Sequence, residues 1–155
     1  MGWLDIVLRL GSAILIGGAI GLNRDLHHKP TGMRTLGLVA LGSTLAVLAV
    51  AGDPAAVSRV IQGIITGIGF LGAGVILHRP TGGKVHGLTT AASIWVTAAM
   101  GVLCGIAAWS ILVVGVSLVL LLLMFGGPVE KWCHKRWGSN DDEQTETQSA
   151  AKANR

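Results

Sequence analysis

Five long apolar segments, separated by short polar connections, make up most of the chain as far as residue 126. They cover about 6–22, 36–52, 60–77, 88–104 and 107–126. No Asp, Glu, Lys, Arg or His occurs between Leu88 and Gly126. At about 1.5 Å per residue, one helix over that stretch would be roughly twice as long as the hydrocarbon core is thick, so the chain has to turn back once. The pattern predicts an all-α, polytopic transmembrane helical bundle of five spans.

The remaining segments define the domain organisation. We expect a transmembrane domain over 1–127 and a basic, Trp-anchored juxtamembrane segment over 128–137. Residues 138–155 lack apolar periodicity, which predicts a disordered polar tail. No basic region precedes the first apolar segment, so we expect a retained span rather than a cleaved signal peptide.

Composition and charge agree with a membrane protein whose partner is the lipid bilayer. Of the 155 residues, 51% are hydrophobic and 13% charged, whereas soluble domains average about 25% charged. Basic residues gather in the connections 23–34 and 78–87 and after the last span. The positive-inside rule therefore predicts an N-terminus outside and a C-terminus in the cytoplasm. Because these charges flank apolar segments, the net charge of +4 does not indicate nucleic-acid binding.

The third span contains a G-x-G-x-x-G pattern, Gly67-Ile68-Gly69-Phe70-Leu71-Gly72. A dinucleotide site would need a preceding strand and an acidic residue about 20 positions later, but no Asp or Glu lies between Pro54 and Val129. In a bilayer, glycines let helices pack closely. We therefore expect the third span at the centre of the bundle. The predicted helix-packing glycines are Gly17, Gly21, Gly63, Gly67, Gly69, Gly72 and Gly74.

Residues 28–43, "HKPTGMRTLGLVALGS", align without a gap with residues 78–93, "HRPTGGKVHGLTTAAS". One hypothesis is a parallel repeat, in which spans one and two match spans three and four about an axis along the membrane normal. The alternative is convergence, because Pro-Thr-Gly favours a turn and basic residues mark the cytoplasmic side.

Three ordered blocks resemble the MgtC/SapB family of bacterial inner-membrane proteins: "GGAIGLNRDLHHKPTGMRTLGLVALGS", "GIGFLGAGVIL" and "GLTTAASIWVTAAMG". The chain departs from the family pattern at Asn23, where a Glu is usual, and at His86, where an Arg is common. The resemblance implies a short, membrane-only member, without the soluble C-terminal domain of longer ones. It also implies a link to magnesium limitation and virulence, and to action on other membrane proteins such as the ATP synthase.

Basic and acidic residues crowd the expected cytoplasmic end of the first two spans. One interpretation is topology determination with surface ion pairs, which are worth only about 0–1 kcal/mol each. The other is a functional polar cluster at the mouth of the bundle, in which Arg24 and Asp25 lock the connecting loop. The candidate cluster consists of Arg24, Asp25, Lys29, Arg34, Thr89 and Thr90.

Two further sets of polar residues have structural interpretations. Asp5 and Arg9, four residues apart at the outer edge of the first span, are predicted to form an ion pair. Small and hydroxyl residues repeat every fourth position on the fourth span, and predict either a packing seam or a polar path. That ridge consists of Thr89, Ser93, Thr97, Gly101 and Gly105.

The histidines, His27, His28, His78, His86 and His134, all map to the cytoplasmic side. They could sense pH or hold a metal weakly, but their spacing matches no dedicated metal pattern, so we predict no metal site. No nucleophile or acid–base constellation occurs, and we expect neither an enzyme nor a cofactor.

The leading functional hypothesis is a non-enzymatic modulator of magnesium or ion homeostasis, or of membrane partner proteins, in the bacterial inner membrane. Its small-residue faces predict a homodimer or higher homo-oligomer, with a membrane-protein partner as a further option. The alternative is a small ion transporter or channel. Magnesium prefers carboxylate oxygen and spans two to five contain no carboxylate, so conduction would need a pore between subunits or backbone carbonyls.

Overall fold

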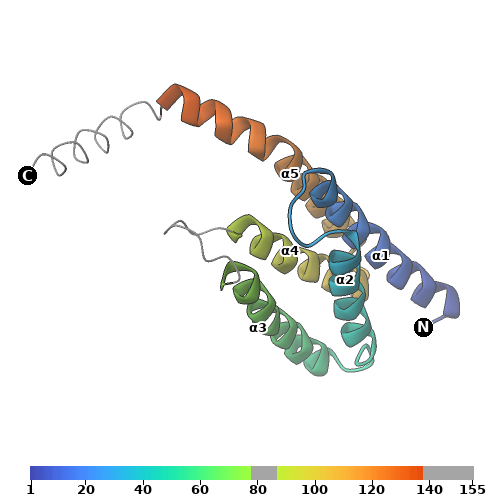
Figure 1. The fold of residues 1–155 in the computed structure, drawn as a ribbon. Helices are drawn as coiled ribbons and strands as arrows, with labels where there is room; N and C mark the ends of the chain where they lie inside the picture. The colour runs from blue at the N-terminus through green and yellow to red at the C-terminus, as the bar shows by residue number, and fades with distance from the viewer. Residues whose placement is uncertain (78–86, 138–155) are drawn as a thin grey trace, which may run out of the picture. The chain divides into compact units, whose positions relative to one another are not determined.

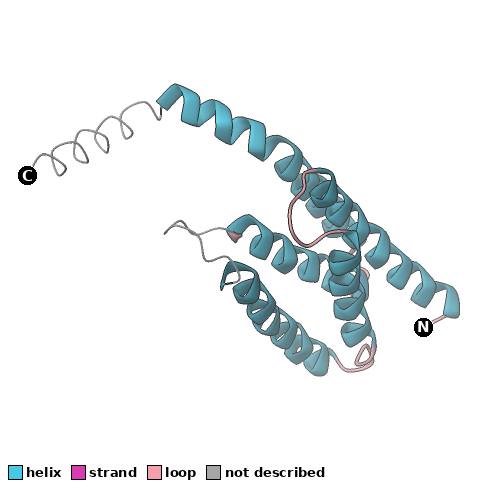
Figure 2. Ribbon diagram, in the orientation of Figure 1, coloured by secondary structure: helices cyan, strands magenta, loops and turns pink. Residues whose placement is uncertain are grey.

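The computed structural model of the chain describes residues 1–77 and 87–137, and all regular structure in these residues is helical (Figure 2). The predicted polar tail over 138–155 lies outside the described residues. The helices are α1 (Trp3–Leu26), α2 (Met33–Leu48), α3 (Pro54–Leu77), α4 (Leu88–Gly105) and α5 (Trp109–Trp137). The five apolar segments correspond to these five helices in order, which confirms an all-helical bundle.

Four of the described helices, α1, α3, α4 and α5, are long and apolar enough to cross a membrane. The fifth, α2, has 16 residues, which correspond to about 24 Å. It ends at Leu48 rather than near residue 52 because the chain turns there. In this turn the amide of Ala51 donates to the Leu48 carbonyl at 3.3 Å, and that of Asp53 to the Val50 carbonyl at 3.0 Å.

Large apolar side chains face outward along the helices. Leu4 in α1 is 78% exposed and Phe70 in α3 is 84% exposed, and many other Leu, Val and Ile side chains share this orientation. A water-soluble monomer rarely exposes so much contiguous apolar surface, whereas lipid tails cover it without penalty. Together with the four spanning helices, this surface indicates a multi-pass membrane protein.

The chain divides into two compact parts, residues 1–120 and a part that begins at Leu121. Within the first part, α4 contacts α1, α2 and α3, and α2 also contacts α1 and α3 (Figure 1). In the second part, the described residues continue α5 through the segment predicted as juxtamembrane. There the guanidinium carbon of Arg136 lies 5.4 Å from the ring centroid of Trp132, within the range of a cation–π contact.

The centre of the first part is α4, not the third span as expected. In α4, 56% of the residues are buried, compared with 6% of the most apolar stretch of α3. The prediction was wrong because glycines show only that a helix can be approached closely. They do not show whether its own chain, a lipid or another protein approaches.

Close backbone packing is built from glycines of α1 and α4 that face α2. A Cβ added to Gly17 would lie 2.5 Å from the Leu36 carbonyl oxygen, and one added to Gly21 would lie 2.6 Å from the Met33 nitrogen. A Cβ added to Gly105 would lie 2.7 Å from the Val47 Cβ. Only hydrogen fits at these positions, so α1 and α4 approach α2 with their backbones.

The glycines of α3 do not show the helix packing that the sequence predicts. A Cβ added to Gly72 would be 3.4 Å from the Ala91 Cβ of α4, an ordinary contact. Gly63, Gly67, Gly69 and Gly74 have no heavy atom of the described chain within 4 Å of an added Cβ. Within the described residues these four glycines do not pack against another helix, contrary to the prediction.

The proposed repeat stays a prediction. The two helices of each pair are in contact, α1 with α2 and α3 with α4. However, Gly67, the counterpart of the closely packed Gly17, faces open space. The glycine contacts of the first pair are thus not reproduced in the second.

The end of α4 offers a stability prediction. The amide of Ala108 donates to the Leu103 carbonyl at 3.0 Å and that of Ala107 to the Cys104 carbonyl at 3.1 Å, the two bonds of a Schellman motif. Ala107 occupies the left-handed position with φ 56°, which costs an L-residue about 1–2 kcal/mol. Ala107→Gly removes this strain but adds unfolded-state freedom worth about 0.4–1 kcal/mol. We expect a net stabilisation of about 0.5–1 kcal/mol.

This change is measured by detergent unfolding in mixed micelles. Ala108→Gly is the matched control, because Ala108 has no positive φ and should be destabilised by glycine. Equal effects of the two substitutions would contradict the assignment of the left-handed position.

Candidate functional site

Arg24, in the last turn of α1, is the one charged side chain that is buried in the described part of the chain, with 3% exposed. Its Nη1 donates to Ser93 Oγ at 3.0 Å and its Nη2 donates to Thr90 Oγ1, both on α4. Its Nε and Nη2 donate to the Pro30 carbonyl oxygen at 3.3 and 3.2 Å. These four residues, Arg24, Pro30, Thr90 and Ser93, form the Arg24 cluster, which joins α1, the connection to α2, and α4.

The charge of Arg24 is balanced by dipoles. No carboxylate lies within 4.0 Å of it among the described residues, where the ion pairs are Asp5–Arg9 and Asp53–Arg59. Its place at the end of α1 sets it at the negative end of that helix dipole. The planar guanidinium presents donors in a fixed fork, so one side chain can reach two hydroxyls and a carbonyl at the same time.

Local sequence directs the connection back toward Arg24. The amide of Lys29 donates to the Arg24 carbonyl and that of His28 to the Asp25 carbonyl, both at 3.0 Å. His28 takes the left-handed position with φ 52°, so α1 also ends in a Schellman motif. Pro30 cannot continue the helix, and its carbonyl becomes the acceptor for the guanidinium.

Asp25 holds the start of α2. Its Oδ2 accepts a hydrogen bond from the Met33 amide at 2.9 Å, the first amide of α2, where the helix dipole favours a negative charge. A Cβ added to Gly32 would overlap the Asp25 carboxylate, so Gly32 leaves the room that this cap requires. Asp25 therefore acts across the connection, next to the Arg24 cluster.

Of the six predicted cluster residues, the structure brings Arg24 and Thr90 into contact. Asp25 follows Arg24 in sequence, and its carboxylate binds the Met33 amide instead. The side chains of Lys29, Arg34 and Thr89 are exposed, and none of these three side chains forms a hydrogen bond with the Arg24 guanidinium. Thr89 contributes only its carbonyl, which accepts from Ser93 Oγ at 2.7 Å.

Sequence reasoning missed two members of the Arg24 cluster. Ser93 was placed in the small-residue ridge rather than at the site, although its spacing of three from Thr90 puts both hydroxyls on one helix face. The Pro30 carbonyl had no signal of its own, because a backbone acceptor is recruited by the path of the connection.

The small-residue ridge of α4 packs against α2. Ser93, Thr97, Gly101 and Gly105 are buried, whereas Thr89 is exposed. Thr97 Oγ1 donates to the Ser93 carbonyl at 2.7 Å. Buried hydroxyls that bond to backbone carbonyls are typical of a packing seam.

One inter-helix hydrogen bond fixes the register of this seam. Thr44 Oγ1 of α2 lies 2.7 Å from the Gly101 carbonyl oxygen and 2.9 Å from the Ala40 carbonyl oxygen. Gly101 therefore contributes both a side-chain-free surface and an acceptor to the contact with α2.

At the other end of α1, Arg9 makes two links. Its Nη2 lies 2.9 Å from Asp5 Oδ2, and its Nε donates to Asp5 Oδ1 at 2.9 Å. Its Nη1 donates to the Gly105 carbonyl at 2.6 Å, one of the last carbonyls of α4, which lack a helical partner. Arg9 thus ties α1 to the end of α4.

The described residues contain no group of three or more His, Cys, Asp or Glu side chains that could hold a metal ion. His27 and His28 are exposed, and His27 Nδ1 lies 2.7 Å from the Asn23 carbonyl oxygen. His78, His86 and the side chain of His134 fall outside the described residues.

Comparison with known proteins supports the resemblance seen in the sequence. The profile of the MgtC family matches residues 10–132. Protein SrpB of Synechococcus elongatus is 42% identical over 151 residues, which cover 87% of this chain and 83% of SrpB. No solved structure matches the chain significantly.

Two further relatives match a shorter stretch of this chain. Protein MgtC of Brucella abortus is 48% identical over 99 residues, 62% of this chain and 40% of that protein. Protein MgtC of Salmonella typhimurium is 43% identical over 101 residues, 64% of this chain and 43% of that protein. The chain thus spans less than half the length of these two relatives. The family profile, which matches most of the chain, and the similarity to SrpB show that the chain belongs to the MgtC family.

Proposed function

We propose that this protein is a non-enzymatic modulator of magnesium or ion homeostasis, or of a membrane partner protein, in the bacterial inner membrane. Family membership supports a role shared with the relatives named MgtC and SrpB. The basic connections support an N-terminus outside and a C-terminus in the cytoplasm. One structural observation carries the choice of modulator over transporter: the buried charged side chain is a cation, Arg24.

A buried guanidinium is a poor neighbour for a divalent cation. Magnesium keeps most of its water and binds through carboxylate oxygens, and the buried polar side chains of the described residues include no carboxylate. The buried hydroxyls of Thr44, Ser93 and Thr97 already donate to backbone carbonyls. A magnesium path through one copy of the bundle would have to pass a fixed positive charge without compensating oxygens.

The proposal includes self-association or a membrane-protein partner. The helix α3 is largely uncovered by its own chain, and Gly69 and Gly74 have no neighbour within 4 Å among the described residues. Glycines on a spanning helix allow close approach of another helix. Phe70, exposed between these glycines, would add apolar area to such a contact.

The test is magnesium flux into sealed vesicles. Purified protein is reconstituted in vesicles that contain a magnesium-sensitive dye, and external Mg²⁺ is added under an inward gradient. We expect the same rate as in empty vesicles, with a known magnesium channel as the positive control. A strain that lacks the gene should nevertheless grow poorly at low magnesium and recover with the wild-type gene.

Protein-dependent flux in these vesicles would contradict the modulator and favour a pore formed between subunits. Normal growth of the deletion strain at low magnesium would contradict a role in magnesium homeostasis.

A further inference from the structure

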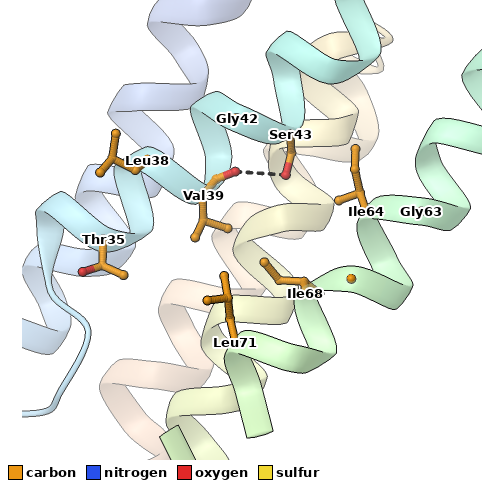
Figure 3. A pocket seen from close by; sticks show the side chains of 10 residues that line it. Thr35, Leu38, Val39, Gly42, Ser43, Gly63, Ile64, Ile68 and Leu71 are labelled. Carbon is orange, nitrogen blue, oxygen red and sulfur yellow. Dashed lines mark hydrogen bonds between the residues drawn. The ribbon is translucent and has the colours of Figure 1, made fainter. Parts of the chain in front are cut away.

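An open apolar groove lies between α2 and α3 (Figure 3). It has a volume of about 540 Å³, and none of its lining residues is charged. Thr35 and Leu71 lie toward one end, and Ser43 and Gly63 toward the other (Figure 3). The Ser43 hydroxyl donates to the Val39 carbonyl at 2.9 Å (Figure 3), so it presents no unsatisfied donor to the groove.

The dimensions of the groove favour a chain-like occupant over a helix. A helix with side chains is about 10–12 Å wide. The groove is lined from Thr35 to Ser43 on α2 and from Gly63 to Leu71 on α3, about 12 Å along each helix. It would therefore receive only about two of the roughly five to six turns of a transmembrane helix. A single lipid acyl chain is narrow, and can lie along the groove between the walls of α2 and α3.

The charge at one end of the groove favours an anionic head group. Arg34 precedes Thr35 and lies one turn before Leu38, which lines the groove, on the same side of α2. Its side chain is exposed, and no carboxylate lies within 4.0 Å of it among the described residues. Lys29, also exposed, belongs to the connection that leads into α2. Basic residues beside a groove between spanning helices are the setting in which anionic lipid head groups bind.

We propose that this groove binds one acyl chain of an anionic phospholipid, whose phosphate contacts Arg34. The acyl chain lies against Gly67, Leu71 and Leu38, and the head group sits at the end of α2 that begins with Met33. The site is separate from the Arg24 cluster, whose guanidinium is buried.

The test uses native mass spectrometry of the purified full chain in detergent, titrated with phosphatidylglycerol or phosphatidylcholine of identical acyl chains. Wild-type protein should hold phosphatidylglycerol about fivefold more tightly, the effect of one basic residue near an anionic lipid. Arg34→Gln should abolish this preference and leave phosphatidylcholine binding unchanged. Arg59→Gln, which replaces another exposed arginine, is the matched control and should behave as wild type.

Two further variants test the groove itself. Gly67→Leu places a side chain into open space within the groove, so the protein should fold and lose the bound lipid. Gly69→Leu adds the same side chain to the same helix outside the groove and should retain it. Gly63→Leu, also within the groove, repeats the test should Gly67→Leu fail to fold.

Three results would overturn the proposal. They are equal affinity of wild type for the two lipids, equal lipid retention by Gly67→Leu and Gly69→Leu, and dissociation of a dimer by Gly67→Leu with lipid binding unchanged. The last result would assign the groove to a second copy of the chain.

Discussion

Replacement of Gly101 by alanine should lower the free energy of unfolding by roughly 2–4 kcal/mol. A Cβ at this position would overlap the Ala40 carbonyl oxygen, and would lie 2.9 Å from both the Ala40 Cα and the Ser43 Cβ. Two of these three atoms belong to the backbone, so rotation of a side chain cannot relieve the overlap. The helices α2 and α4 must separate, which also stretches the 2.7 Å hydrogen bond from Thr44 to the Gly101 carbonyl.

The matched control for this substitution is Gly11→Ala. Gly11 is also helical, but it has no heavy atom within 4 Å of an added Cβ in the described chain. Because alanine favours the helix over glycine by about 1 kcal/mol, this variant should be neutral or more stable. Both are measured by unfolding in mixed micelles with increasing sodium dodecyl sulfate. A Gly101→Ala variant as stable as Gly11→Ala would show that α2 and α4 do not pack through their backbones.

Replacement of Arg24 by glutamine should lower the free energy of unfolding by roughly 2–4 kcal/mol. Hydrogen bonds to a charged group are worth about 1.5–3 kcal/mol each, and Arg24 donates to Ser93, to Thr90 and to the Pro30 carbonyl. The neutral glutamine does not bear the desolvation cost of a buried charge. The loss in unfolding free energy should therefore be smaller than the sum of these hydrogen bonds.

Arg24→Lys separates charge from geometry. Lysine keeps the positive charge but lacks the planar fork that reaches several acceptors at once, so it should remain destabilised by at least about 1 kcal/mol. Thermal unfolding in detergent provides the measurement. Wild-type stability of Arg24→Lys would mean that only a charge is needed at this position, contrary to the fork geometry.

The helices could be predicted from the sequence because the interruptions between apolar segments are clear. Charged connections, Pro54 and Gly87 all fall at or next to helix boundaries in the described chain. The order of helices in space was not predictable in the same way. The glycines of α3 suggested a central helix, yet α4 is central because Gly101 and Gly105 meet α2 directly. Sequence spacing shows which face of a helix is small, and tertiary packing decides which neighbour uses it.

The candidate site was predictable in part. Arg24 and Asp25 stood out because charge at the end of a spanning helix requires a reason, and Thr90, in the first turn of α4, was predicted to belong with them. Ser93 had a signal in its spacing of three from Thr90, but it was assigned to the packing ridge. The Pro30 carbonyl had none, since its role depends on how the connection folds. The exposed Lys29 and Arg34 show that charge alone does not identify members of a buried cluster.

A double-mutant cycle between Arg24 and Thr90 tests most directly whether a guanidinium from α1 locks onto α4. Unfolding free energies are measured for Arg24→Gln, Thr90→Val and the double variant. The cycle is repeated with Thr89→Val, because Thr89 is the exposed neighbouring threonine. The direct contact predicts a coupling of about 1–3 kcal/mol for Arg24 with Thr90 and additive effects for Arg24 with Thr89. Additive effects in both cycles, or equal coupling in both, would contradict a direct contact between the Arg24 guanidinium and Thr90.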